Sequence, residues 1–224
     1  YFKEYKGSVT IPETVTYGGI TYSVTSIDGR AFHDCTGLTE LTIADGEGTL
    51  KVGYNTYNPS GYSSSPGYGQ FYACPLTKLY LGRNLEYEGN VWYGYSPFYG
   101  ITTLKSVEIG NSVTSIGQDA FKGCTGLTKA TFASIKNLCG INFANSSANP
   151  LCYAKHLFIG NEEVTEVVIP EDVTSIGRYA FYNCSRLTSI EIPESVISIG
   201  SDAFYWCSGL EKAEFASIEQ ICNI

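Results

Sequence analysis

The residues best suited to nucleophilic chemistry lie together in the stretch FHDC, residues 32–35. His33 and Cys35 are the residue types that a cysteine enzyme pairs as general base and nucleophile. Adjacent side chains rarely face each other, however, and Cys35 follows a spacing that recurs along the chain. We therefore expect His33 to have a structural role or to lie at the protein surface. His156, the other histidine, stands apart in a strand-like stretch, and the same expectation holds for it.

The carboxylates are scattered, and no pair has the spacing that acid–base catalysis would require. The stretches ADGEG and NEE match no recognised calcium-binding loop. The chain has no glycine-rich phosphate loop, no G-x-S-x-G elbow and no C-x-x-C pair. The sequence therefore predicts a protein that is not an enzyme and that needs no cofactor and no metal.

Tyrosine exceeds what a fold requires, with ten of its 18 copies between residues 54 and 99. Tyrosine offers a large contact area and a hydroxyl at low entropic cost, which suits recognition. The candidate ligand-binding residues are Tyr54, Tyr57, Tyr62, Tyr68, Trp92, Tyr93 and Tyr95. The alternative, that these rings pack against an irregular part of the fold, is equally compatible with the sequence.

Charge and hydropathy exclude two classes of partner. The 224 residues carry a net charge of −8 and no cluster of lysine or arginine, which disfavours nucleic acid and anionic membranes. No apolar run reaches the length that a membrane-spanning helix needs. We therefore expect no nucleic-acid binding and no membrane insertion by this segment.

An internal repeat explains most of the hydrophobic pattern. The stretches LTSIEIPESVISIG (187–200), VTEVVIPEDVTSIG (164–177) and LKSVEIGNSVTSIG (104–117) share apolar positions. Each predicts a half-buried strand, a turn at Pro or Gly, and a second short strand. The following DAFKGC, YAFYNC and DAFYWC predict a single helical turn. No such unit can bury its apolar side alone, so the units must stack as coils of a solenoid.

Five cysteines keep the phase of this repeat, each three residues after a phenylalanine. They are Cys35, Cys74, Cys124, Cys184 and Cys207. A residue fixed to one phase of a coil occupies the same interior position in each turn. We expect reduced thiols that pack as small buried hydrophobes, in preference to disulfides or metal ligands.

The repeat resembles the BspA-like leucine-rich repeats of bacterial surface proteins. The resemblance is carried by SVTSIGQDAFKGCTGLTKATF, by the copies within 164–218, and by GRAFHDCTGLTELTI (29–43). It implies an α/β fold, a right-handed leucine-rich-repeat solenoid with repeats of about 23 residues, rich in strand with short helical turns. It also implies an extracellular or cell-surface location and a protein ligand on a host or neighbouring cell.

The domain expected is one solenoid over residues 1–224, with two irregular stretches. Residues 44–70 predict a Gly/Ser/Tyr-rich insertion, and residues 82–100 an aromatic variant of the coil. Residues 156–159 and 164–169 predict two strands joined by the turn GNEE. The module at 124–141 returns at 207–224, which favours a fragment of a longer chain.

The function predicted is a non-catalytic binding or adhesion module of a secreted or surface-displayed bacterial protein. Its protein ligand would bind the solenoid face or the tyrosine-rich insertion. Two alternatives stay open: a carbohydrate-binding module that uses exposed Tyr and Trp, and an architectural spacer for another domain.

Overall fold

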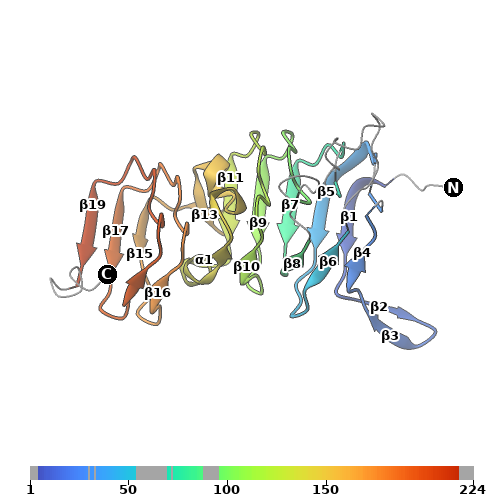
Figure 1. Ribbon diagram of the computed structural model, residues 1–224, viewed down its shortest axis with the longest axis horizontal. Helices are drawn as coiled ribbons and strands as arrows, with labels where there is room; N and C mark the ends of the chain where they lie inside the picture. The colour runs from blue at the N-terminus through green and yellow to red at the C-terminus, as the bar shows by residue number, and fades with distance from the viewer. Residues whose placement is uncertain are drawn as a thin grey trace.

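The computed structural model describes residues 5–29, 31, 32, 34–53, 70, 71, 73–87 and 96–216. Over these residues the chain forms a strand-rich solenoid of about seven turns with few helices. The coils follow one another along the long axis of the molecule (Figure 1). The predicted leucine-rich-repeat solenoid is confirmed.

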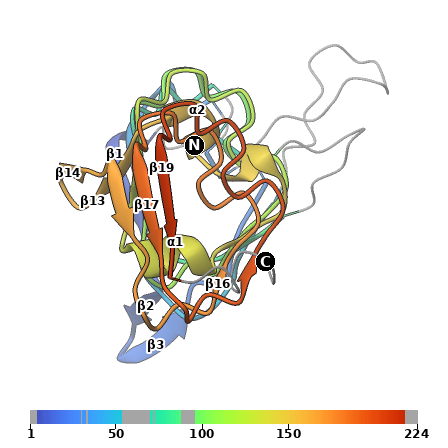
Figure 2. The ribbon, with the colours of Figure 1, turned by 90° about the vertical axis from the view of Figure 1, so that its left-hand side faces the viewer.

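The longer strands line one side of the solenoid. The first sheet has the order β1-β5-β7-β9-β11-β13-β14, and a second has the order β15-β17-β19. Figure 2 shows both sheets on the same side of the molecule. Their strands are β1 (Lys6–Ile11), β5 (Gly37–Ile43), β7 (Lys78–Leu81), β9 (Ser106–Ile109), β11 (Lys129–Phe132), β13 (Leu157–Ile159), β14 (Glu162–Glu163), β15 (Glu166–Val168), β17 (Ser189–Ile192) and β19 (Lys212–Phe215).

The second short strand of each unit pairs with its counterpart in the next coil, in the orders β4-β6-β8, β10-β12 and β16-β18. These strands are β4 (Ser26–Ile27), β6 (Leu50–Val52), β8 (Leu85–Glu86), β10 (Ser115–Ile116), β12 (Asn142–Phe143), β16 (Ser175–Ile176) and β18 (Ser198–Ile199). The remaining elements are the hairpin β2 (Thr14–Tyr17) and β3 (Ile20–Ser23), the helices α1 (Ile135–Gly140) and α2 (Leu151–Ala154), and the 3-10 helix η1 (Ser146–Ala148).

The strand register turns the repeat into interior columns. Leu41 lies opposite Leu79, which lies opposite Val107, and the same column continues through Ala130 to Leu157. All five side chains are buried. Neighbouring strands lie about 4.8 Å apart, so each column is a continuous apolar contact. The spacings that recur within the sequence therefore correspond to one interior position that each coil fills once.

Phenylalanine forms a second column at the turns. The rings of Phe71, Phe98 and Phe121 stack nearly parallel, with centroids 5.5 and 5.8 Å apart. Phe181 and Phe204 stack in the same way at 5.2 Å. Between these two runs the helix α2 replaces the usual turn, so the column is interrupted there.

The cysteines lie beside this column as predicted. Four of the five are buried, and Cys207 is half-buried. The Cys124 thiol donates a hydrogen bond to the carbonyl of Phe98 in the preceding coil, at 3.1 Å. Cys207 donates to Phe181 in the same way at 3.0 Å. The thiols therefore connect successive coils, and the seven described cysteines are free.

The hairpin predicted across residues 156–169 has a different pairing. β13 pairs antiparallel with β14, so the turn is the two-residue step at Gly160 and Asn161. Gly160 has φ of +60°, which suits a tight two-residue turn. β15 begins a new coil and pairs with β17 instead. The prediction of two strands was right, but residues 164–169 are not the partner of the first.

Gly126→Ala is expected to lower the free energy of unfolding by about 1–3 kcal/mol, because an added methyl would collide with the backbone carbonyl of Thr102 in the preceding coil. Gly140→Ala is the matched control, since a methyl there meets no atom within 4 Å. Urea denaturation of both variants measures the difference. Equal stabilities would contradict the close packing of the coils at Gly126.

Candidate functional site

The aromatic residues singled out by the sequence lie outside the described part of the chain. These are Tyr54, Tyr57, Tyr62, Tyr68, Trp92, Tyr93 and Tyr95. The same is true of His33. The structure does place the residues that join segments 54–69 and 88–95 to the solenoid.

The two aromatic segments leave the solenoid at neighbouring points. Gly53 directly follows β6 and Tyr87 directly follows β8, and these strands pair in parallel. The chain returns just before Phe71 and Phe98, whose rings stack with centroids 5.5 Å apart. The described residues that flank the two segments are therefore neighbours on both sides, although 34 positions separate Gly53 from Tyr87. The expected insertion at 44–70 follows the repeat as far as β6.

Buried polar side chains hold both returning ends in place. The Gln70 amide donates to the carbonyl of Asp28 at 2.6 Å. The Ser96 hydroxyl donates to the carbonyls of Asp119 and Ala120. Gln70 and Ser96 are both buried, so these bonds are shielded from water. The two segments consequently grow from a rigid base.

Both segments occupy the same interval of the repeat, between the end of the second short strand and the buried residue three positions after the column phenylalanine, which is Cys74 in one coil and Ile101 in the next. In the last two coils this interval corresponds to residues 177–184 and 200–207. We refer to the side of the solenoid formed by this interval as the turn edge. Extra residues of a repeat protein usually gather on one face, and that face often binds the ligand.

A cluster of three aromatic rings, two of them exposed, lies on the turn edge of the last two coils. The rings of Tyr182 and Tyr205 stack with centroids 5.7 Å apart and an angle of 21°. Trp206 lies 5.3 Å from Tyr205 and 5.9 Å from Tyr182. Tyr205 is 50% exposed and Trp206 is 60% exposed. Trp206 turns back over the preceding coil, so the three rings form one patch across two coils.

An arginine borders this patch. The Arg178 guanidinium lies over the ring of Tyr179, 4.5 Å from its centroid. The ring of Tyr179 in turn meets Tyr182 edge-on at 5.7 Å. Asp202 lies 4.0 Å from the guanidinium. The patch therefore combines two exposed rings and the half-buried ring of Tyr182 with one cation and one anion.

Two of these aromatic residues have a backbone conformation that bulky residues avoid. Trp206 has φ of +62° and Tyr179 has φ of +61°. Only small or polar residues adopt this left-handed region readily. The positions equivalent to Trp206 in other coils hold Asp34, Ala73, Gly100, Gly123 and Asn183. The positions equivalent to Tyr179 include Asp119 and Asp202. A tryptophan at such a position costs stability, on the order of 1 kcal/mol, and stacking on Tyr182 and Tyr205 offsets this cost only in part because the ring is 60% exposed.

The patch rests on a buried amide. Asn149 is fully buried, and its side chain donates to the carbonyls of Tyr179 at 2.7 Å and Ala180 at 2.9 Å. Its oxygen accepts from the backbone N–H of Leu151 at 2.9 Å. These bonds fix the left-handed backbone at Tyr179. Sequence reasoning missed this site, although a Trp at a Gly/Asn repeat position is a signal that could have found it.

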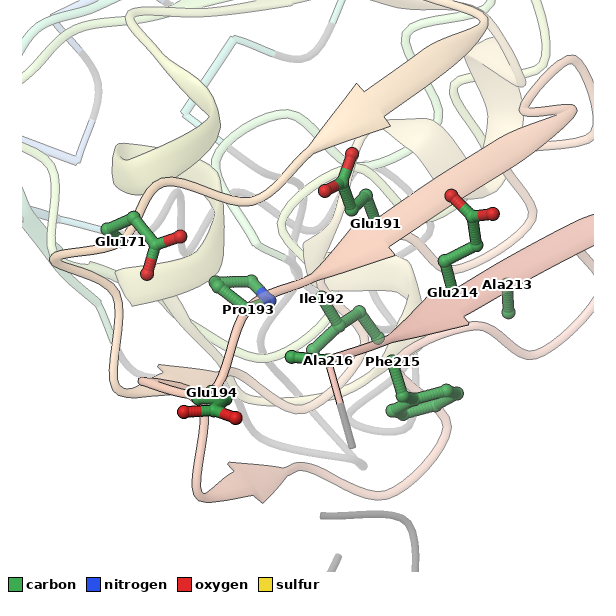
Figure 3. Close-up of a pocket in the computed structure, with 9 residues that line it drawn as sticks. All are labelled: Glu171, Glu191, Ile192, Pro193, Glu194, Ala213, Glu214, Phe215 and Ala216. Atoms are coloured by element: carbon green, nitrogen blue, oxygen red, sulfur yellow. The ribbon is translucent and has the colours of Figure 1, made fainter. Parts of the chain in front are cut away.

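A pocket of about 720 Å³ lies beside β17 and β19 (Figure 3). Four glutamates line it: Glu171, Glu191, Glu194 and Glu214. Glu191 and Glu214 face each other on paired strands, and the Lys212 ammonium lies 2.6 Å from Glu214. No three carboxylates, histidines or cysteines of the described residues converge as metal ligands. The carboxylates line the pocket without forming a site.

The described residues that could do chemistry are engaged structurally. His156 Nδ1 lies 2.8 Å from Glu163 Oε1 across the β13–β14 hairpin. Burial raises the pKa of Cys124 and Cys184 to about 12. A catalytic thiol needs a lowered pKa, so these cysteines have the opposite of nucleophilic character.

None of the helices in the described ranges is long and apolar enough to cross a lipid bilayer.

Comparison with known proteins identifies the repeat. The profile of the BspA-type leucine-rich repeat region matches residues 8–66, 59–150 and 153–223, with six copies. A search of curated proteins finds no match.

Three solved structures of bacterial proteins are similar to the chain. A leucine-rich repeat protein from Bacteroides ovatus is 21% identical over 94% of this chain and 64% of its own, with a TM-score of 0.38. A leucine-rich cell surface protein from Faecalibacterium prausnitzii is 17% identical over 100% of this chain and 91% of its own, with a TM-score of 0.36. The T. pallidum leucine-rich repeat protein is 23% identical over 78% of this chain and 63% of its own, with a TM-score of 0.33.

The chain thus spans slightly less than two thirds of the Bacteroides ovatus protein. Solenoids of this kind are generally non-enzymatic scaffolds. With the profile covering nearly all residues and the coils stacked as the repeat requires, the chain belongs to the BspA-type leucine-rich-repeat family.

Proposed function

We propose that this chain is a non-catalytic binding module of a secreted or surface-displayed bacterial protein, and that it recognises a protein ligand through its turn edge. The observation that carries the proposal is the exposed Trp206, held in a left-handed conformation beside Tyr182 and Tyr205. A strained and exposed aromatic residue costs stability in the free protein. Binding to a partner is the gain that would compensate this cost.

The chemistry of the patch favours a protein ligand over a sugar. Trp, Tyr and Arg are the residues that dominate the binding energy of protein interfaces. The three rings are inclined to one another by 21–45° and pack against each other, so they do not form one flat platform for a sugar ring. The described residues that flank segments 54–69 and 88–95 lie on the same edge, and we include Tyr54, Tyr57, Tyr62, Tyr68, Trp92, Tyr93 and Tyr95 in the proposal as candidate ligand contacts outside the described residues.

Trp206→Asn tests the proposal. Asn183 occupies the equivalent position one coil earlier, so the variant keeps a backbone the repeat already uses. Relief of the left-handed strain and loss of ring stacking oppose each other, so the free energy of unfolding should change by less than about 1 kcal/mol. Binding to a ligand found on an array of purified extracellular proteins should weaken by about 30-fold or more, as for a hot-spot residue.

Ile197→Asn is the matched control, because Ile197 is 72% exposed and lies away from the turn edge. A second variant replaces residues 54–69 with a short Gly-Ser link. Unchanged affinity in both Trp206→Asn and the 54–69 replacement would contradict the turn edge as the binding surface. A ligand found on a parallel glycan array instead would favour carbohydrate recognition, and no ligand on either array would favour a spacer.

A further inference from the structure

The hairpin of β2 and β3 has two chemically distinct faces. Residues 14–23 read TVTYGGITYS and pair in continuous antiparallel register around Gly18 and Gly19. Both glycines have positive φ, as the tightest hairpin turns require. One face presents Val15, Tyr17, Ile20 and Tyr22. The other presents Thr14, Thr16, Thr21 and Ser23, with the Thr16 and Thr21 hydroxyls 3.2 Å apart.

The apolar face of this hairpin is uncovered. Tyr17 is 81% exposed and Ile20 is 58% exposed, and the other two side chains are nearly half exposed. Among the described residues, β2 and β3 pair only with each other. Figure 1 shows the hairpin projecting from the body at the N-terminal end of the solenoid. A lone two-stranded hairpin is marginally stable in water, so an uncovered apolar face is unusual.

A buried arginine fixes the base of the hairpin. Arg83 is almost fully buried, and its guanidinium donates to the carbonyls of Pro12 at 2.9 Å and Val24 at 3.0 Å. These carbonyls belong to the two legs of the hairpin, just outside β2 and β3. The Val24 N–H also donates to the Glu13 carbonyl at 2.8 Å. Burying a charged group to hold a projecting arm pre-organises that arm for contact.

We propose that this hairpin is a self-association arm, through which the apolar face of one copy packs on the same face of a second copy. The register places Val15 opposite Tyr22 and Tyr17 opposite Ile20, so the two aliphatic side chains lie on one diagonal and the two aromatic ones on the other. A twofold axis lying in the interface, along or across the strands, brings every aliphatic side chain onto an aromatic one of the second copy. The face is therefore complementary to itself, as a twofold interface requires.

Charge does not oppose a second copy at this place. The chain carries a net charge of −8, so two copies repel each other over most of their surface. Residues 14–23 contain no charged side chain, and the hairpin projects away from the body. The arm is thus a place where two copies can meet without bringing like charges together. Four side chains a copy make a small interface, so the association should be weak, with a dissociation constant on the order of micromolar to millimolar.

Sedimentation velocity of the full chain over a concentration series tests the proposal. The wild-type weight-average mass should rise from that of one copy toward that of two. Ile20→Lys should raise the dissociation constant at least about tenfold, because it places two ammonium groups in the apolar contact. Thr21→Lys is the matched control, since it adds the same charge at the next residue on the opposite face and should associate like the wild type. Urea denaturation of both variants confirms that each is folded.

Two outcomes would overturn the proposal: a wild-type chain that stays monomeric throughout the series, or equal loss of association in both lysine variants. The first outcome, joined to Ile20-dependent co-sedimentation with neutral phosphatidylcholine vesicles, would assign the arm to a lipid surface instead. The sedimentation test is independent of the proposed turn-edge function, because the variants that probe the hairpin leave Trp206 unchanged and Trp206→Asn leaves the hairpin unchanged.

Discussion

Phe121→Ala is expected to lower the free energy of unfolding by about 3–5 kcal/mol. Phe121 is fully buried and its ring stacks on Phe98 with centroids 5.8 Å apart. Truncation removes these contacts and leaves a cavity between coils whose backbones are already tied together by the sheet. The surrounding residues can relax little, so the cavity should persist and the full cost should be observed.

Phe204→Ala is the comparison variant, because it removes a half-buried phenylalanine ring that also stacks on the phenylalanine of the preceding coil. Its ring stacks on Phe181 at 5.2 Å but faces solvent in part. We expect a smaller loss, about 1–3 kcal/mol. Urea denaturation monitored by circular dichroism compares the two variants. A Phe121 variant as stable as the Phe204 variant would contradict the phenylalanine column as a main source of stability.

The chain is also expected to lose stability steeply as the pH rises above 9. Burial raises the pKa of Cys124, Cys139 and Cys184 from 9.0 to about 12. Below pH 9 these thiols are protonated in both states, and their stabilising contribution is fully present. Between pH 9 and about 12 the unfolded chain releases protons that the folded chain keeps, so rising pH favours unfolding.

Each of these thiols should contribute a slope of about 1.4 kcal/mol per pH unit, or about 4 kcal/mol per pH unit for the three together. Urea denaturation at several pH values between about 8 and 11 measures the slope. Half-buried Tyr87 and buried Cys74, whose pKa values burial also raises, add to the slope in the same direction. Cys139→Ala isolates one thiol and should reduce the slope by about 1.4 kcal/mol per pH unit. An unfolding free energy that does not change with pH over this range would refute the argument.

The repeat phase predicted most of the interior residues, although Phe204 and Cys207 in the last coil are only half-buried. Cys124 and Phe121 recur at fixed offsets, and both are buried as expected. The reason is physical: in a stacked coil, one sequence position always faces the same position of the next coil. A periodic apolar pattern along the chain therefore indicates which positions are buried.

Local pairing was harder to predict where the repeat gives way to a hairpin. The sequence placed the partner of β13 at 164–169, whereas the structure pairs it with Glu162 and Glu163. The register of a hairpin depends on the turn geometry. The sequence predicted the four-residue turn GNEE, whereas the structure has a two-residue turn at Gly160, so the apolar pattern placed the second strand too late in the chain. The β2–β3 hairpin was not predicted at all, because its exposed apolar residues resemble those of a buried strand.

The candidate site shows the same division. Density of tyrosine pointed to Tyr54 and its neighbours, which stay a prediction. Tyr182 and Tyr205 lie in the repeated stretches YAFYNC and DAFYWC, 23 positions apart, and they were not among the predicted ligand-binding residues. The exposure of Tyr205 and Trp206, and the position of Trp206 against both tyrosines, depend on which side of the coil the turn edge faces, and a repeat pattern does not contain that information.

The sequence by itself determined the family, the solenoid, the strands of each coil and the buried columns, because all of these depend on a pattern that repeats with the coil. The tertiary structure alone decided which aromatic residues are exposed, that segments 54–69 and 88–95 grow from adjacent strands, and that Arg83 clamps a distant hairpin. These features join residues from different coils. Contacts of that kind follow from the three-dimensional register of the stack and leave no periodic trace in the sequence.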